Sequence, residues 1–131
     1  MKNTNKTLKL IVERTDTGYS AYAKDFPIFT TGRTINDLQK NAYEAVNLFF
    51  EEEGIQIRQG TIQFEIDFQQ FFKYYNVLNA KFLAEKIGMN PTLLSQYVNG
   101  RKKPSKVQAE KIIHGIHQIG NELSEISLLY S

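Results

Sequence analysis

The most constraining feature of this chain is a run over residues 79–105 that carries the start and stop signals of two short helices. Asn79 can cap the first helix, because its side-chain oxygen accepts a hydrogen bond from a backbone N–H of the first turn. Gly88 can end that helix, since glycine adopts the left-handed backbone conformation at little cost. Asn90 and Pro91 then open a second helix, with a cap and with a proline where the missing N–H does no harm. The pattern predicts two helices joined by a tight turn.

The second predicted helix has one apolar and one polar side, and a basic loop follows it. Leu93, Leu94 and Tyr97 recur at helical spacing and are expected to pack inward. Asn99-Gly100 ends the helix, and the loop 101–104 reads Arg-Lys-Lys-Pro. Such a helix suits the major groove, where outward side chains reach base edges while a basic loop lies over phosphates. The predicted DNA contacts are Thr92, Ser95 and Gln96 to bases, Asn79, Lys81, Asn99, Arg101, Lys102 and Lys103 to phosphates, and Asn90 at the start of the helix.

This run resembles the helix-turn-helix of lambda-repressor-like regulators. The resemblance is carried by Leu83-Ala84, Gly88, Pro91-Thr92, Ser95-Gln96-Tyr97, Gly100 and Pro104. Ala84 is small where the two helices would cross, so their backbones can approach closely. The alternative interpretation is an ordinary helical hairpin with a solvated basic loop.

Charge is distributed unevenly along the 131 residues, although the net charge is only +2. Residues 1–66 carry 8 Lys and Arg against 9 Asp and Glu, whereas residues 79–111 carry 7 against 2. The asymmetry places the expected nucleic-acid footprint in the second half. The chain has no Cys, no signal-peptide core and no apolar run near the length of a membrane span, so we expect a cytoplasmic protein without a membrane partner.

The first half is predicted to be a small α+β domain. Alternating apolar residues indicate strands over 7–14, 19–24, 28–31 and 61–66. A helix capped by Thr34 is expected to bury one apolar face and to end at Gly54 after three glutamates. That face comprises Ile35, Leu38, Ala42, Ala45, Val46 and Phe49. The order β-β-β-α-β predicts one helix packed on one face of a mainly antiparallel sheet.

The same half resembles the N-terminal domain of HicB-type antitoxins. The matching motifs are Tyr19-Ser20-Ala21-Tyr22, Asp25-Phe26-Pro27, Thr31-Gly32-x-Thr34 and Asn41-Ala42-x-Glu44-Ala45. Lys24 and Ile28-Phe29 depart from the family pattern at the turn after the second strand. The resemblance implies a truncated ribonuclease-H-like fold over residues 1–66, and a small ribonuclease toxin of the HicA type as partner.

Nothing in the sequence predicts catalysis, a cofactor or a metal. A ribonuclease-H-type enzyme needs several carboxylates converging on Mg²⁺. Asp16, Asp25, Asp37 and Asp67 instead occupy a turn, a strand end and two caps. His114 and His117 could share a helix face, but no further ligand is spaced to join them. We therefore expect a scaffold that is not an enzyme.

Residues 67–131 are predicted to form an all-α DNA-binding domain with a dimerisation segment at its end. Asp67 caps a first helix with an aromatic stripe of Phe68, Phe71, Phe72 and Tyr75. Ser105 caps a last helix, with Val107, Ile112, Ile113 and Ile116 expected inward, although Gly115 and Gly120 weaken it. A seam with heptad spacing follows, and residues 121–131 could be helix or strand. The seam comprises Ile112, Ile116, Ile119, Leu123, Ile126 and Tyr130.

Together these features predict an antitoxin of a type II toxin–antitoxin pair. As the resemblance implies, it would neutralise a small ribonuclease toxin; as the helix-turn-helix predicts, it would repress its own operon by binding operator DNA as a homodimer or higher oligomer. The alternative is a DNA-binding regulator whose N-terminal domain binds a small molecule or only oligomerises.

Overall fold

The computed structural model describes residues 2–3, 7–57 and 59–130, which divide into two compact units, Met1–Tyr74 and Tyr75–Ser131. The division falls after Tyr74, whereas the sequence predicted a boundary after Ile66. In the first unit the elements are β1 (Lys2–Asn3), β2 (Leu8–Thr15), β3 (Gly18–Ala23), β4 (Phe29–Gly32), α1 (Ile35–Phe50), η1 (Glu51–Glu53), β5 (Ile55–Gln56), η2 (Gln59–Thr61), β6 (Ile62–Ile66) and α2 (Phe68–Tyr74). In the second unit they are α3 (Ala80–Ile87), α4 (Pro91–Val98), α5 (Lys106–Ile126) and η3 (Ser127–Tyr130).

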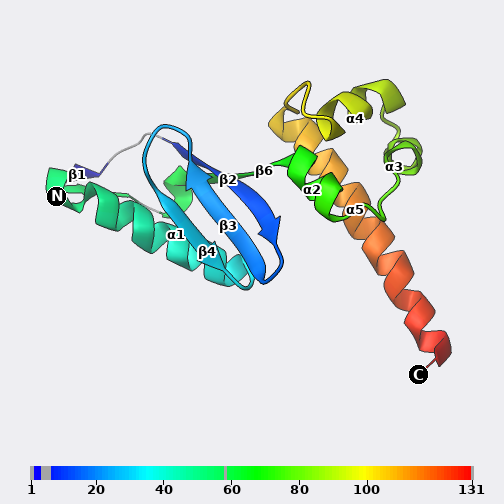
Figure 1. The fold of residues 1–131 in the computed structure, drawn as a ribbon, viewed down its shortest axis with the longest axis horizontal. Coiled ribbons are helices and arrows are strands. Elements are labelled where there is room, and N and C mark those ends of the chain that lie inside the picture. The colour runs from blue at the N-terminus through cyan, green and yellow to red at the C-terminus, as the bar shows by residue number, and fades with distance from the viewer. Residues whose placement is uncertain (1, 4–6, 58, 131) are drawn as a thin grey trace. The chain divides into compact units, whose positions relative to one another are not determined.

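The first unit is mixed α+β, with a sheet in the strand order β4-β3-β2-β6 (Figure 1). β3 pairs antiparallel with β2 and β4, whereas β6 runs parallel to β2, with Leu10 opposite Phe64. The parallel pair follows from the connection through α1, because a parallel partner requires a crossover rather than a hairpin. The short parallel pair of β1 and β5 was not predicted from the sequence.

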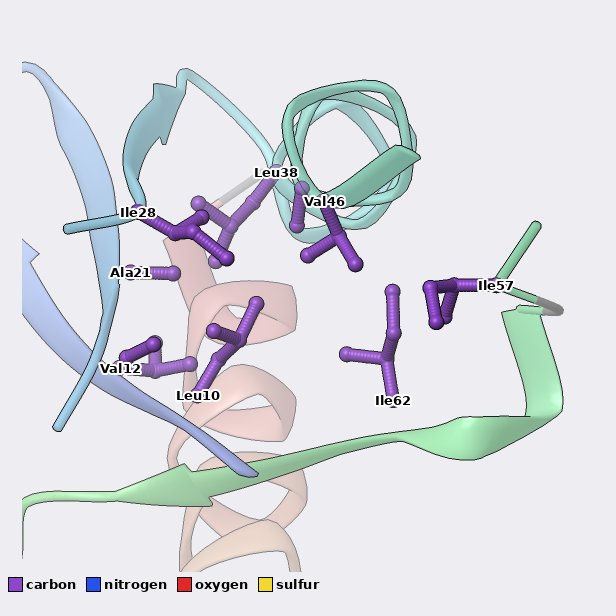
Figure 2. Close-up of a cluster of buried hydrophobic side chains, with 10 residues drawn as sticks. Leu10, Val12, Ala21, Ile28, Leu38, Val46, Ile57 and Ile62 are labelled. Carbon is purple, nitrogen blue, oxygen red and sulfur yellow. The ribbon is translucent and has the colours of Figure 1, made fainter. Parts of the chain in front are cut away.

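The core of this unit lies between α1 and one face of the sheet (Figure 2). Strand alternation points Leu10 and Val12 to this face, where they meet Leu38 and Val46 of α1. The apolar face predicted for α1 includes two residues that the structure does not bury. Ile35 and Phe49, in the first and last turns of α1, are exposed instead of buried. The buried stripe is confined to Leu38, Ala42 and Val46.

α2 belongs to the first unit, although it was predicted to open the DNA-binding half. Its start is capped as expected, since the Gln70 N–H donates to Asp67 Oδ1 at 3.1 Å. Gln70 also binds both backbone groups of Arg14 on β2, accepting from its N–H at 2.9 Å and donating to its carbonyl at 2.7 Å. The Gln70 side-chain amide therefore takes the place of a strand residue beside β2, just beyond the end of β6. Phe68 and Phe72 are buried in the aromatic stripe, and Tyr75 falls beyond the end of the helix.

The second unit packs α3 against both α4 and α5. Its buried side chains are Leu83, Ala84, Met89, Leu94, Tyr97 and Ile112. Gly115 is buried where α5 meets α3. A Cβ added there would lie 2.2 Å from Ile87 Cγ2 and 3.0 Å from Leu83 Cδ1. The glycine that was expected to weaken α5 therefore permits a close helix crossing.

α5 is continuous from Lys106 to Ile126 and is followed by the 3-10 turn η3. Of the two conformations left open for residues 121–131, the structure therefore shows helix, not strand, as far as Tyr130. Ser131, the last residue of the predicted segment, lies outside the described residues. Val107 and Ile113, which were predicted to face inward, are exposed. At 3.6 residues per turn, the face set by Ile112 and Gly115 turns both of them away. No helix of the described residues is long and apolar enough to cross a bilayer.

Candidate nucleic-acid interface

The turn between α3 and α4 is built as predicted, with Gly88 ending α3 at a positive φ of 69°. The Gly88 N–H donates to the carbonyl of Glu85 at 3.3 Å, and the Met89 N–H donates to that of Ala84 at 2.9 Å. This pair of bonds is the Schellman arrangement, which satisfies carbonyls at the end of a helix. Met89 is buried directly after the turn. The turn therefore fixes the direction in which α4 leaves α3.

Asn90 organises the start of α4. Its Oδ1 accepts hydrogen bonds from the N–H of Thr92 at 2.8 Å and from that of Leu93 at 3.3 Å. Pro91 occupies the first helical position, where no N–H is needed. Both features were predicted, and together they hold the first turn of α4 in place, with Asn90 itself exposed.

The two sides of α4 differ sharply in burial. Leu94 and Tyr97 are 1% and 7% exposed and anchor the helix to the unit. Thr92 and Ser95 are exposed, and Gln96 is half-buried. The predicted outward face is therefore presented to solvent on a helix whose opposite side is fixed by packing.

The basic loop is folded back on the end of α4. Gly100 adopts a φ of 73°, and the N–H groups of Arg101 and Lys102 both donate to the Gln96 carbonyl, at 2.9 and 3.2 Å. The side chains of Arg101, Lys102 and Lys103 are exposed. The two backbone bonds therefore hold Arg101 and Lys102 at the C-terminal end of α4.

Ser95 and Asn99 form a pair that the sequence did not predict. Asn99 Nδ2 donates to Ser95 Oγ at 3.2 Å across one turn of α4. Because this bond uses a lone pair of the hydroxyl oxygen, the Ser95 O–H remains available to donate to an acceptor on a base edge. The bond also removes freedom from both side chains before any ligand binds.

The two predicted contacts from the start of α3 lie in the same unit. Asn79 caps α3 by accepting from the Phe82 N–H at 3.0 Å, and Lys81 is exposed in the first turn. Phe82 is itself exposed, and the sequence did not single it out. The structure thus places all ten predicted DNA contacts on α3, α4, their caps and the following loop, and all are exposed except the half-buried Gln96.

The remaining residues singled out in the sequence are two histidines and an aspartate. His114 and His117 are exposed on α5, and Asp67 caps α2. Within residues 2–3, 7–57 and 59–130, no group of three or more His, Cys, Asp and Glu residues is placed to hold a metal ion.

In comparisons with known proteins, no family model, no curated protein and no solved structure matches this chain.

Proposed function

We propose that this protein is a HicB-like antitoxin that also represses its own operon. The second unit would bind operator DNA, and the first unit would bind and block a small ribonuclease toxin in the cytoplasm. The observation that best supports DNA binding is the polar side of α4. Thr92 and Ser95 are exposed there, while Leu94 and Tyr97 lie in the core.

In this proposal α4 enters the major groove. Thr92, Ser95 and Gln96 face base edges, and the loop cations contact the phosphates beside the groove. The capped start of α4 supports this arrangement, since Asn90 fixes the turn that first meets the bases. The two backbone bonds to the Gln96 carbonyl support it as well, because they hold Arg101 and Lys102 next to the same helix.

A substitution test separates the two kinds of DNA contact. Arg101→Ala with Lys102→Ala should weaken binding to every duplex by about tenfold or more and lower the salt dependence by about two phosphate contacts per protomer. Gln96→Ala should instead reduce the preference for the operator over unrelated duplexes. Arg33→Ala with Lys40→Ala is the matched control, since it removes two exposed cations from the first unit. If all three proteins bind DNA like the parent in a gel shift, the assignment of this face is wrong.

Two-fold DNA binding requires a dimer, and the end of α5 supports one. Ile112 is buried within the unit, whereas Leu123 and Ile126, farther along the same heptad seam, are 61% and 52% exposed. Tyr130 in η3 continues the seam and is also exposed. A second copy of this segment would cover these side chains by pairing the two seams.

Light scattering tests the dimer. Leu123→Lys with Ile126→Lys should halve the mass in solution, because four charges would face one another across the paired seams. Asn121→Lys with Ser124→Lys is the matched control, since it adds the same charge at exposed polar positions of α5. An unchanged mass in the first variant would place the dimer interface elsewhere.

The proposed antitoxin function rests on the resemblance of the first unit to HicB-type domains. The strand and helix order β2-β3-β4-α1-β6 is compatible with the fold that the resemblance implies. Two of the matching motifs contact each other, since Asn41 Nδ2 donates to the Thr31 carbonyl at 2.8 Å. Gly32 in the same motif lies against α1, where an added Cβ would be 2.4 Å from the Leu38 nitrogen. These contacts give the motif residues a structural reason to occur together.

Co-expression tests this half. The product of the reading frame beside this gene should be a small basic protein that arrests growth, and this chain should relieve the arrest. Continued arrest in the presence of full-length protein would count against the antitoxin function. A protein that binds DNA but has no such neighbour would instead be a regulator whose first unit binds a small molecule or only oligomerises.

A further inference from the structure

We propose that two copies of this chain join through β6, the strand at one edge of the sheet (Figure 1). The β6 strand of each copy pairs antiparallel with that of the other about a two-fold axis at Phe64, and the two sheets become one. This pairing requires neither DNA nor a toxin, since all its residues lie in the first unit. It adds a second contact between copies to the one proposed for α5.

The hydrogen bonds between β2 and β6 determine which backbone groups of β6 point outward. The Asp67 N–H donates to the Val12 carbonyl at 3.0 Å, so the odd-numbered residues of β6 direct their N–H and C=O groups toward β2. The even-numbered residues Ile62, Phe64 and Ile66 therefore direct theirs to the open edge. Within the described residues of the first unit, the outward groups of Phe64 and Ile66 have no hydrogen-bond partner.

The opposite edge of the sheet, formed by β4, is partly covered. The Ile28 carbonyl accepts from the Ala23 N–H of β3 at 3.1 Å, so Thr31, an odd number of residues further on, directs its groups away from β3. The outward Thr31 carbonyl accepts a hydrogen bond from Asn41 of α1 at 2.8 Å. Covering an edge with a helix is one way in which proteins prevent unwanted strand pairing. Of the two edges, β6 is therefore the one at which a further strand can be added.

The outward residues of β6 are arranged symmetrically, which identifies a second copy as the occupant. An antiparallel pair centred on Phe64 places Phe64 opposite its counterpart and Ile62 opposite Ile66 of the other copy. By strand alternation all three side chains lie on the α1 face, so the contacts on that face are apolar. On the other face, Gln63 lies opposite Glu65, and no two carboxylates are directly opposed. A strand that matches itself in this way favours a second copy over a foreign peptide, because both sides of a two-fold interface are the same surface.

Two of these apolar side chains are left partly uncovered by the first unit. Ile62 points into the core (Figure 2). Ile66 is 37% exposed although it lies on the core face of the sheet, and Phe64 is only half-buried. In the joined sheet, Ile62 of the other copy covers Ile66, and the two Phe64 side chains cover each other. The α1 helices of both copies then lie on the same face.

Engineered cysteines test the pairing of residues, because the chain has no cysteine of its own. An equimolar mixture of full-length Gln63→Cys and Glu65→Cys proteins should form a disulfide-linked pair under mild oxidation, since these positions are directly opposed. Either variant alone should not link, because the same position in two copies lies on a diagonal about 7–8 Å apart. Linking in the mixture no greater than in the separate variants would overturn the inference.

A second variant tests the strength of the pairing. Ile66→Lys places a charge at a partly exposed position of the edge and should raise the dissociation constant of the pair by about tenfold or more. Phe29→Lys is the matched control, since it adds the same charge at an exposed apolar position of the other edge strand, and it should leave the pairing unchanged. Light scattering over a dilution series measures both, in chains that also carry Leu123→Lys and Ile126→Lys. In that background only β6 pairing contributes to the mass.

Amide hydrogen exchange follows the pairing at the strand itself. The Phe64 N–H should exchange more slowly as the protein concentration rises, because it then donates to the other copy. An exchange rate that is independent of concentration would overturn the inference, as would the mass of a single chain in the Leu123→Lys, Ile126→Lys background. If that background has the mass of the parent protein and the cysteine mixture still links, the dimer proposed for α5 fails and the β6 pairing stands.

Discussion

Gly115 gives the sharpest test of how the second unit is packed. Gly115 and Gly120 lie in the same helix, so replacing either by alanine gains the same helix propensity of about 1 kcal/mol. Their surroundings differ. A Cβ at Gly120 meets nothing within 4 Å, whereas a Cβ at Gly115 lies 2.2 Å from Ile87 Cγ2 and 3.0 Å from Leu83 Cδ1. The pair of substitutions therefore isolates the helix crossing.

The expected magnitudes follow from these distances. Gly120→Ala should raise the free energy of unfolding of the second unit by about 1 kcal/mol. Gly115→Ala adds an overpacking cost of about 1–3 kcal/mol, so after the propensity gain its net effect lies between about 0 and 2 kcal/mol of destabilisation. Ile87→Ala removes the methyl group that clashes. It should therefore make Gly115→Ala less harmful, which would appear as a favourable coupling in a double-mutant cycle.

Urea denaturation followed by circular dichroism measures these differences, and amide hydrogen exchange in α3 and α5 assigns them to the second unit. The expected order of stability is Gly120→Ala, then the parent protein, then Gly115→Ala. If Gly115→Ala is as stable as Gly120→Ala, then α3 and α5 do not approach as closely as the crossing requires.

Two further predictions concern single residues. Asn90→Ala should lower the stability of the second unit by about 1 kcal/mol, because the N–H groups of Thr92 and Leu93 lose their acceptor; Asn90→Asp keeps the acceptor, and equal urea midpoints for the two variants would refute the cap. Burial, followed by the carboxylates of Glu13 and Asp67, raises the pKa of Tyr22 above 10.0. The stability that this shift contributes is present below pH 10 and is lost as the pH rises through the pKa of the folded state. Glu13→Gln should lower that pKa without returning it to the ordinary value, since burial is the larger cause; NMR of labelled tyrosine rings measures it, and an unchanged pKa would contradict the assignment.

Helices α3 and α4 and the turn between them could be predicted from the sequence because their signals are local. Asn79 caps an N–H three residues away, and Asn90 caps N–H groups two and three residues away. Gly88 and Gly100 adopt the positive φ angles that their positions require. Such interactions depend on nearest neighbours along the chain and little on the rest of the fold.

The features that were missed depend on distant residues. Gln70 binds Arg14 across 56 positions, and this contact draws α2 into the first unit. By helix propensity alone Gly115 would be expected to weaken α5, whereas the 2.2 Å between an added Cβ and Ile87 Cγ2 shows that a small residue is needed there. Val107 matches the apolar pattern of α5, yet the helix phase turns it outward.

The candidate site shows the same limit. Its residues could be predicted, because polar and basic side chains on a short capped helix stand out in the sequence. Their coupling could not, because the bond between Asn99 and Ser95 and the attachment of Arg101 to the Gln96 carbonyl depend on how α4 ends.

Hydroxyl-radical footprinting of the full-length protein on the DNA upstream of its own coding region tests DNA binding by α4 most directly. A two-fold dimer that inserts α4 into the major groove should protect two half-sites about 34 Å apart. The protection should disappear when Arg101 and Lys102 are replaced by alanine and persist when Arg33 and Lys40 are. Uniform protection, or equal affinity for an unrelated duplex, would contradict a sequence-reading role for the face of Thr92, Ser95 and Gln96.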